Sequence, residues 1–100
     1  MSELDPGPVL AAMSKNASLQ VFLRGDRIAQ LPARQSRRRL LLGEIVQAFE
    51  PGVRYPDGAV NEFLKSLHDD NAALRRYLVD EGFLERADGV YWRIGSPPPS

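Results

Sequence analysis

The 100 residues suit a single domain, and their charges balance, because 13 lysines and arginines stand against 13 aspartates and glutamates. The absence of cysteine excludes disulfides, thiolate catalysis and cysteine-based metal sites. No apolar run approaches the roughly 20 residues of a membrane span, and the acidic N-terminus is unlike a signal peptide, so we expect a cytoplasmic protein without a membrane partner.

The charges are unevenly distributed along the chain. Residues 24–39 hold six arginines and one aspartate, which gives this basic segment a net charge of +5. Residues 68–86 hold three arginines and five acidic side chains, a net charge of −2. Because strong nonspecific nucleic-acid binders usually carry a basic excess, any attraction for phosphate is expected in the basic segment.

An N-terminal extension is predicted before the main domain. The apolar side chains of residues 8–23 have spacings that suit one broken helix or two short helices. We therefore treat residues 1–18 as an extension that is partly helical or flexible. Arg24-Gly25-Asp26 is typical of a turn, and residues 27–31 suit a short strand.

The first of three core helices is predicted over about residues 34–49. Its apolar side chains recur at helical spacing and form one face: Leu41, Leu42, Ile45, Val46 and Phe49. Pro51-Gly52 ends this helix. Residues 53–55 are expected to be extended, because Pro56 disfavours helical angles in the residue before it.

Two further helices are predicted to follow closely on one another. Asp57 is a good N-cap for the second helix, which ends near His68. Asp69 or Asp70 caps the third helix, residues 71–81. Gly82 is then the expected left-handed stop, since glycine adopts a positive φ without penalty.

After the third helix, the apolar residues no longer recur at helical spacing. Residues 83–86 and 90–93 are short β-type runs, and the Asp88-Gly89 pair between them is a strong hairpin signal. The order of helix, short strand, helix, helix and hairpin is that of a winged helix-turn-helix. The predicted fold class is α+β and mainly helical, with the winged helix in residues 19–94 and a disordered proline-rich tail in residues 95–100.

The sequence also resembles a bacterial family known only as a domain of unknown function. The resemblance covers about residues 19–94. It rests on His68-Asp69-Asp70, on LRRYLVDEGFLER at 74–86, on GVYWR at 89–93, and upstream on FLRGD at 22–26, LP at 31–32 and FEPG at 49–52 with Tyr55. That family occurs alone and fused to regulators of the ArsR and MarR type. The resemblance therefore implies a winged-helix fold and a regulatory setting, but no activity.

Arg75 and Arg76 are the first candidates for a nucleic-acid contact. They project away from the core side of the third helix, which enters the major groove in helix-turn-helix proteins. Arginine can bind guanine or phosphate with two hydrogen bonds. The alternative is pairing within the protein, because Asp80 lies four residues after Arg76. Asn71 can read adenine, but in a first helical turn we favour a capping role.

The arginine triplet at positions 37–39 opens the first core helix. Three cations near a helix N-terminus oppose the helix dipole, so their presence suggests a use, such as binding phosphate or an acidic partner. Arg34, Arg37 and Arg38 are therefore candidate contacts. The alternative is a solvated face whose side chains lie over the apolar stripe.

The predicted hairpin supplies the remaining candidates. Arg86 and Arg93 flank it and can reach a minor groove or phosphates. Strand alternation places Tyr91 and Arg93 on one face and Trp92 on the other. We expect one aromatic face of the hairpin to cover the core rather than to stack on bases.

Nothing in the sequence indicates catalysis or a cofactor. No nucleophile elbow, glycine-rich phosphate loop or paired carboxylate site is present. His68 is the only histidine, and beside Asp69 and Asp70 it suits a capping turn with an imidazole–backbone hydrogen bond better than a metal site. We expect a protein that is not an enzyme and that needs no cofactor or metal.

Two hypotheses of function follow. The first is a regulatory module that binds double-stranded DNA through the third helix, the hairpin and the basic segment. The second is a protein-interaction or homodimerisation module on the same scaffold. The acidity of residues 68–86 favours the second hypothesis, and Val9, Leu10 and Met13 offer an apolar contact for another copy.

Overall fold

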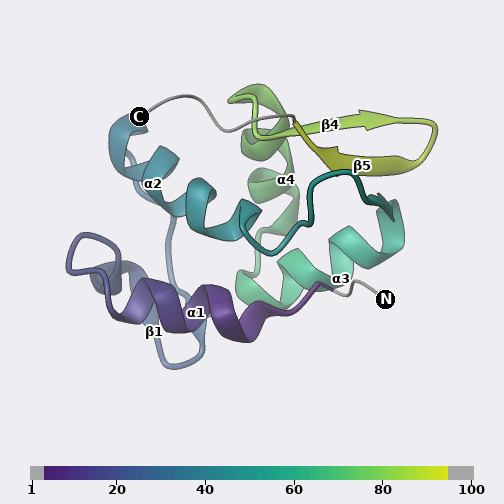
Figure 1. The fold of residues 1–100 in the computed structure, drawn as a ribbon. Helices are drawn as coiled ribbons and strands as arrows, with labels where there is room; N and C mark the ends of the chain where they lie inside the picture. Colours follow the sequence, from purple (N-terminus) through teal and green to yellow (C-terminus); the bar gives the residue numbers. More distant parts are fainter. Residues whose placement is uncertain (1–3, 95–100) are drawn as a thin grey trace.

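The computed structural model describes residues 4–94. This part of the chain is an α+β fold with four α-helices and two small antiparallel sheets (Figure 1). The elements in chain order are α1 Pro6–Ser14, the 3₁₀ turn η1 Gln20–Phe22, β1 Leu23–Arg24, β2 Arg27–Ile28, α2 Gln35–Val46, β3 Arg54–Pro56, α3 Asp57–Leu67, α4 Asn71–Asp80, β4 Leu84–Ala87 and β5 Val90–Arg93. The predicted tail at 95–100 lies outside the described residues.

The N-terminal region forms the two short helical pieces that the sequence offered as one alternative. The Asp5 carboxylate caps α1 by accepting a hydrogen bond of 2.9 Å from the Gly7 amide. Val9 and Met13 are buried in the same core as the later helices. A dimer contact through these two side chains would therefore require α1 to leave that core.

The first sheet is a minimal hairpin. Leu23 and Arg24 of β1 pair with Ile28 and Arg27 of β2. Gly25 in the turn has a φ of 64°, which glycine adopts without strain. The predicted strand over residues 27–31 is shorter in the structure and ends at Ile28.

Helix α2 ends earlier than its apolar pattern suggests. Leu41, Leu42, Ile45 and Val46 are buried, but the helix stops at Val46. The amide of Phe49 then bonds to the Val46 carbonyl at 3.0 Å, an i−3 bond that tightens the last turn. Phe49 stays in the core, where its ring lies edge-on to Tyr55 and Phe63 at centroid distances of 5.2 and 5.7 Å.

Helix α3 begins differently from the prediction. Its N-cap is Pro56, and Asp57 is the first helical residue without a side-chain capping bond. The predicted N-cap role of Asp57 is therefore wrong. Its amide donates to the Gly89 carbonyl at 2.9 Å, and its carboxylate is bound by Arg86, so this residue joins α3 to the C-terminal hairpin instead.

Helix α4 follows α3 after only three residues and begins at a true cap. The Asp70 carboxylate accepts a hydrogen bond of 3.1 Å from the Ala73 amide, which confirms one of the two predicted caps. Asn71 is the first residue inside the helix, so the capping role favoured for it belongs to Asp70. Gly82 follows the helix with a φ of 83°, as predicted.

The second sheet has the strand order β3-β5-β4, with β5 in the middle. The β4–β5 hairpin turns through Asp88 and Gly89, whose φ values of 50° and 80° are those of a type I′ turn. Ala87 and Val90 face each other across this turn. Tyr91 is buried, so the prediction that an aromatic residue of the hairpin covers the core is confirmed.

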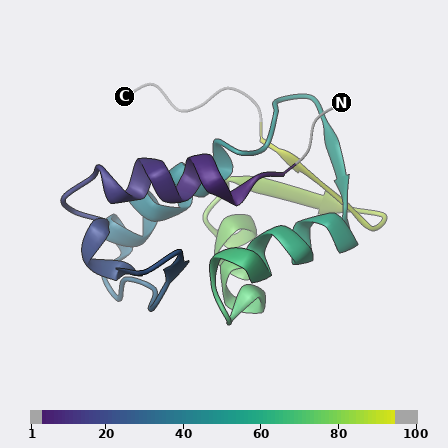
Figure 2. The same ribbon diagram turned by 90° about the horizontal axis from the view of Figure 1, so that it is seen from below.

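The four helices share one core. Helix α1 packs against α2 and α3, and α4 packs against the same two helices. In Figure 2, α1 runs along the top of the view, α4 lies in its lower half, and the hairpin extends to the right. In residues 4–94, no helix is both long enough and apolar enough to cross a membrane.

Candidate nucleic-acid interface

The outer face of α4 is open to solvent. Leu74 and Leu78 turn into the core, whereas Ala72, Arg76 and Val79 are exposed at helical spacings of four and three residues. Among residues 4–94, Arg76 forms no ion pair, and the predicted pairing with Asp80 is not among the ion pairs of this part of the chain. Of the two arginines on α4, Arg76 is therefore the one whose side chain is exposed to solvent and available to a ligand.

Arg75 is held differently from its neighbour. It is half-buried, and its guanidinium donates a hydrogen bond to the Asn61 side-chain oxygen on α3. The amide of Asn61 leaves the positive charge of Arg75 uncompensated. Arg75 thus keeps its charge at the junction between α3 and α4 while its side chain is fixed in one orientation.

The hairpin places a third arginine close to the start of α3. Arg86 of β4 binds Asp57 through two hydrogen bonds, from Nε at 3.3 Å and from Nη2 at 3.1 Å. The hydrogen bond with Arg86 holds the pKa of the Asp57 carboxyl below its ordinary value of 3.8 and raises the pKa of Arg86. The Arg86 guanidinium also lies 5.6 Å from the centre of the Tyr91 ring.

Tyr91 and Arg75 belong to the same neighbourhood. Burial raises the pKa of the Tyr91 hydroxyl, and the positive charges of Arg75 and Arg86 lower it in part. Arg75 also lowers the pKa of Asp57 by its charge. The positive charges of Arg75 and Arg86 therefore both lie near Asp57 and Tyr91, and Asp57 is the acidic group among them.

The arginine triplet of α2 has a largely internal use. Arg38 Nε lies 2.7 Å from Glu81 Oε2 at the end of α4, and the side chains are only 16% and 8% exposed. Arg39 bonds to the Glu81 backbone oxygen at 3.0 Å. The two guanidiniums also cover Tyr77 and Phe83, at 4.4 and 4.8 Å from the ring centres. We call this group, Arg38, Arg39 and Glu81, the α2–α4 clamp.

The clamp changes the interpretation of the basic segment. The acidic partner suggested for the triplet lies within the chain, 43 residues away. Arg27 likewise binds Asp69 at 2.6 Å and the Lys65 carbonyl at 3.0 Å. Arg34 and Arg37 remain exposed, and neither forms an ion pair in residues 4–94. Of the three candidates in this segment, Arg38 is therefore engaged and the other two are available.

Arg93 and His68 serve the fold. Arg93 is half-buried and donates to the Phe49 carbonyl at 3.4 Å. His68 Nδ1 lies 2.7 Å from the Ile28 carbonyl oxygen, which confirms the predicted imidazole–backbone bond; because a carbonyl only accepts, Nδ1 carries the proton. Within residues 4–94, no group of three or more histidine and acidic side chains is arranged to hold a metal ion.

A comparison with protein-family models gives one match. The family described as "Uncharacterized protein conserved in bacteria (DUF2087)" matches residues 27–93. The chain belongs to this family. No curated protein and no solved structure matches this chain. The resemblance to a bacterial family of unknown function is thus confirmed, and the fusion of DUF2087 domains to ArsR- and MarR-type regulators stays a prediction.

The DUF2087 match runs from β2 to β5 and leaves α1 outside. Three side chains in it were not predicted as partners of the candidate arginines: those of Asn61, Asp57 and Glu81. Only Glu81 had a signal in the sequence, because three cations at a helix start call for a nearby anion. Nothing in the spacing of Asn61 or Asp57 points to contacts 14 and 29 residues away.

Proposed function

We propose that this DUF2087 chain is a winged helix-turn-helix module that binds double-stranded DNA through the outer face of α4 and the β4–β5 hairpin. The order α2, β3, α3, α4, β4, β5 supports this reading, as does the three-residue link between α3 and α4. The sheet order β3-β5-β4 supports it too, because it joins the hairpin to the strand that precedes α3.

One observation carries the proposal: α4 presents a solvent-exposed face bearing Arg76, and the neighbouring Arg75 is half-buried against α3. In helix-turn-helix proteins the corresponding face lies in the major groove. Arginine can bind phosphate or guanine there through two parallel hydrogen bonds. The hairpin would then reach the backbone beside the groove, as a wing.

The acidic side chains near α4 set the expected strength of binding. Asp80 lies on the outer part of α4, and Asp69 and Asp70 precede its first turn. Their repulsion from phosphate offsets part of the attraction, so we expect nonspecific affinity to be weak and strongly salt-dependent. Arg34 and Arg37 are the additional cations that can contact the DNA backbone.

The experiment is a comparison of Arg76→Ala with Lys15→Ala in duplex-DNA binding at several salt concentrations. Lys15 is an exposed cation at the end of α1, so the control removes one charge away from α4. If Arg76 contacts one phosphate, its loss reduces the slope of log K against log salt by about 0.9. Affinity and slope equal to those of the unaltered protein would contradict the role of α4.

A protein-interaction or dimerisation module is the second candidate. It would use exposed apolar side chains such as Leu40 on α2 and Val21 in η1, which are 51% and 67% exposed. Light scattering of the chain and of Leu40→Ser tests this candidate: a dimer that dissociates in the variant supports it, and a monomer in both cases excludes self-association through Leu40.

A further inference from the structure

The three-stranded sheet β3-β5-β4 buries only one of its faces. Helix α3 packs against β3 and β5, and α4 packs against β4. Each strand has one side chain that is buried in the core: Tyr55, Tyr91 and Leu84. Successive side chains of a strand point to opposite faces, so the neighbours of these three lie on the other side of the sheet. We call this side the outer face; it includes the hairpin that projects from one end of the molecule (Figure 1).

An apolar stripe runs along β5 on the outer face. Val90 and Trp92 are both half-buried there. Ile94 continues the stripe, because its amide bonds at 3.1 Å to a carbonyl just before β4 and so extends the ladder between the two strands. The side chain of Ile94 is 37% exposed. The exposed Pro56 and Ala87 widen the stripe, since they are the partners of Val90 on β3 and β4.

Two opposite charges flank the stripe at Trp92. Arg54 of β3 and Glu85 of β4 are the register partners of Trp92, so they lie on either side of it. The Arg54 guanidinium lies 4.2 Å from the centre of the Trp92 ring. Both charged side chains are exposed, and neither forms an ion pair within residues 4–94. We call Arg54, Trp92 and Glu85 the charged row, because it runs from positive through apolar to negative across the sheet.

The charged row is complementary to itself under a two-fold rotation about an axis parallel to β5. This rotation lays the outer face of a second copy on the first and exchanges the two ends of the row. Arg54 of one copy then faces Glu85 of the other at both ends, and the apolar stripes meet along the axis. A two-fold axis across the strands would instead place like charges opposite each other. The row therefore favours one orientation of a second copy.

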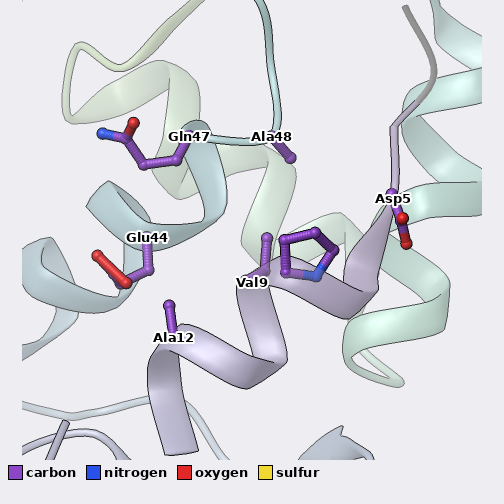
Figure 3. Close-up of a pocket in the computed structure, with 7 residues that line it drawn as sticks. Asp5, Val9, Ala12, Glu44, Gln47 and Ala48 are labelled. Atoms are coloured by element: carbon purple, nitrogen blue, oxygen red, sulfur yellow. The ribbon is translucent and has the colours of Figure 1, made fainter. Parts of the chain in front are cut away.

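The shallow apolar hollow between α1 and α2 lacks this complementarity (Figure 3). Val9, Ala12 and Ala48 line it, and its charged side chains, Asp5 and Glu44, are both acidic. A second copy on this hollow would bring carboxylates near carboxylates. The outer face of the sheet, in contrast, presents both signs of charge around its apolar stripe.

We propose that the chain forms a two-fold homodimer through the outer face of the three-stranded sheet. Two Arg54–Glu85 pairs flank the contact, and the apolar stripes pack between them. The face measures roughly 10–15 Å in each direction, from about 4.8 Å between strands and 3.3 Å per residue. This is small beside a standard interface of about 800 Å² per partner, so the dimer forms reversibly at high protein concentration. Arg86 lies on the opposite face of β4, so the contact does not rest on the DNA-binding proposal, and failure of one leaves the other standing.

The test reverses the charges at the two ends of the row. Self-association is followed by sedimentation velocity and by the indole N–H signal of Trp92, the only tryptophan. Arg54→Glu puts like charges opposite each other at both ends, and so does Glu85→Arg, so each variant alone should dimerise about tenfold more weakly. An equimolar mixture of the two variants should recover the affinity, because a chain with two acidic ends then meets a chain with two basic ends. The chain that carries both changes should also dimerise, since its row is only reversed.

Arg24→Glu is the matched control, because Arg24 is an exposed arginine of the other sheet that forms no ion pair in the described part of the chain. It should leave dimerisation unchanged, and NMR spectra of each variant report whether it is folded. The proposal is overturned if the unaltered chain stays monomeric up to about 1 mM, where even a contact of this size associates. It is also overturned if the mixture associates no more strongly than the single variants. A dimer that Leu40→Ser dissociates but charge reversal leaves intact contradicts it too, because the contact then lies on α2.

Discussion

Replacement of Glu81 with glutamine tests whether the α2–α4 clamp stabilises the fold. The Glu81 carboxylate is 8% exposed and accepts a hydrogen bond of 2.7 Å from Arg38, which is itself 16% exposed. The variant keeps the shape of the side chain but removes its charge. Arg38 then remains positively charged, in a place that water reaches poorly, without its counter-ion.

The size of the effect can be worked out from these contacts. Removing one partner of a buried ion pair costs about 3–5 kcal/mol. Arg38 keeps its contact with the Tyr77 ring and its bond to the Ala33 carbonyl, and Arg39 is 43% exposed, so solvent screens part of the loss. We therefore expect a loss of about 2 kcal/mol, which lowers the Tm of a domain of this size by roughly 8–16 °C.

The assay is urea and thermal unfolding of Glu81→Gln beside Arg37→Ala. Arg37 belongs to the same arginine triplet but is exposed and lies outside the clamp, so its variant should stay within about 0.5 kcal/mol of the unaltered protein. The reasoning is refuted if Glu81→Gln is as stable as the unaltered chain. It is equally refuted if the two variants lose the same stability.

Three further predictions concern the fold. Leu78→Ala should lower the free energy of unfolding by about 2–5 kcal/mol in urea melts, because Leu78 is completely buried; a smaller loss means that this end of α4 is loosely packed. Gly82→Ala should cost about 1–2 kcal/mol, because its φ of 83° strains any L side chain although nothing lies within 4 Å of the added Cβ; an unchanged Tm contradicts this. The bond to Arg86 lowers the pKa of Asp57 in the folded state, so its contribution to stability is full above the ordinary value of 3.8 and is lost as the pH falls through the lowered folded pKa. Asp57→Asn should therefore flatten the acid limb of the stability–pH curve, and an unchanged limb argues against the pair.

Local signals allowed much of the fold to be predicted. Asp70 caps a helix by bonding to an amide three residues away. Gly82 and the Asp88-Gly89 turn act through their own backbone angles. These features depend only on residues close in the sequence, so they can be predicted from it. The spacing of apolar residues located α2, α3 and α4 for the same reason. The predicted end of α2 is three residues too late, because Phe49 is buried although it lies outside the helix. An apolar residue at helical spacing can be buried either in the last turn of a helix or in the loop that follows it.

The candidate site was harder to predict, because arginine side chains are long and their partners are distant in sequence. Asp57 looks like an N-cap locally, but Arg86 binds its carboxylate from 29 residues away. The net charge of the basic segment counts Arg38 and Arg39 as available, although Glu81 engages both. Counting charges by segment therefore overestimated the basic surface of α2.

An NMR titration of the ¹⁵N-labelled chain with duplex DNA at low salt tests directly whether α4 and the β4–β5 hairpin bind DNA. If α4 and the β4–β5 hairpin form a DNA-binding surface, the largest shifts will fall on the exposed residues around Arg76 and on the strands around Arg86. Shifts confined to α1, or no shifts at any DNA concentration, would contradict the DNA-binding role proposed for this DUF2087 chain.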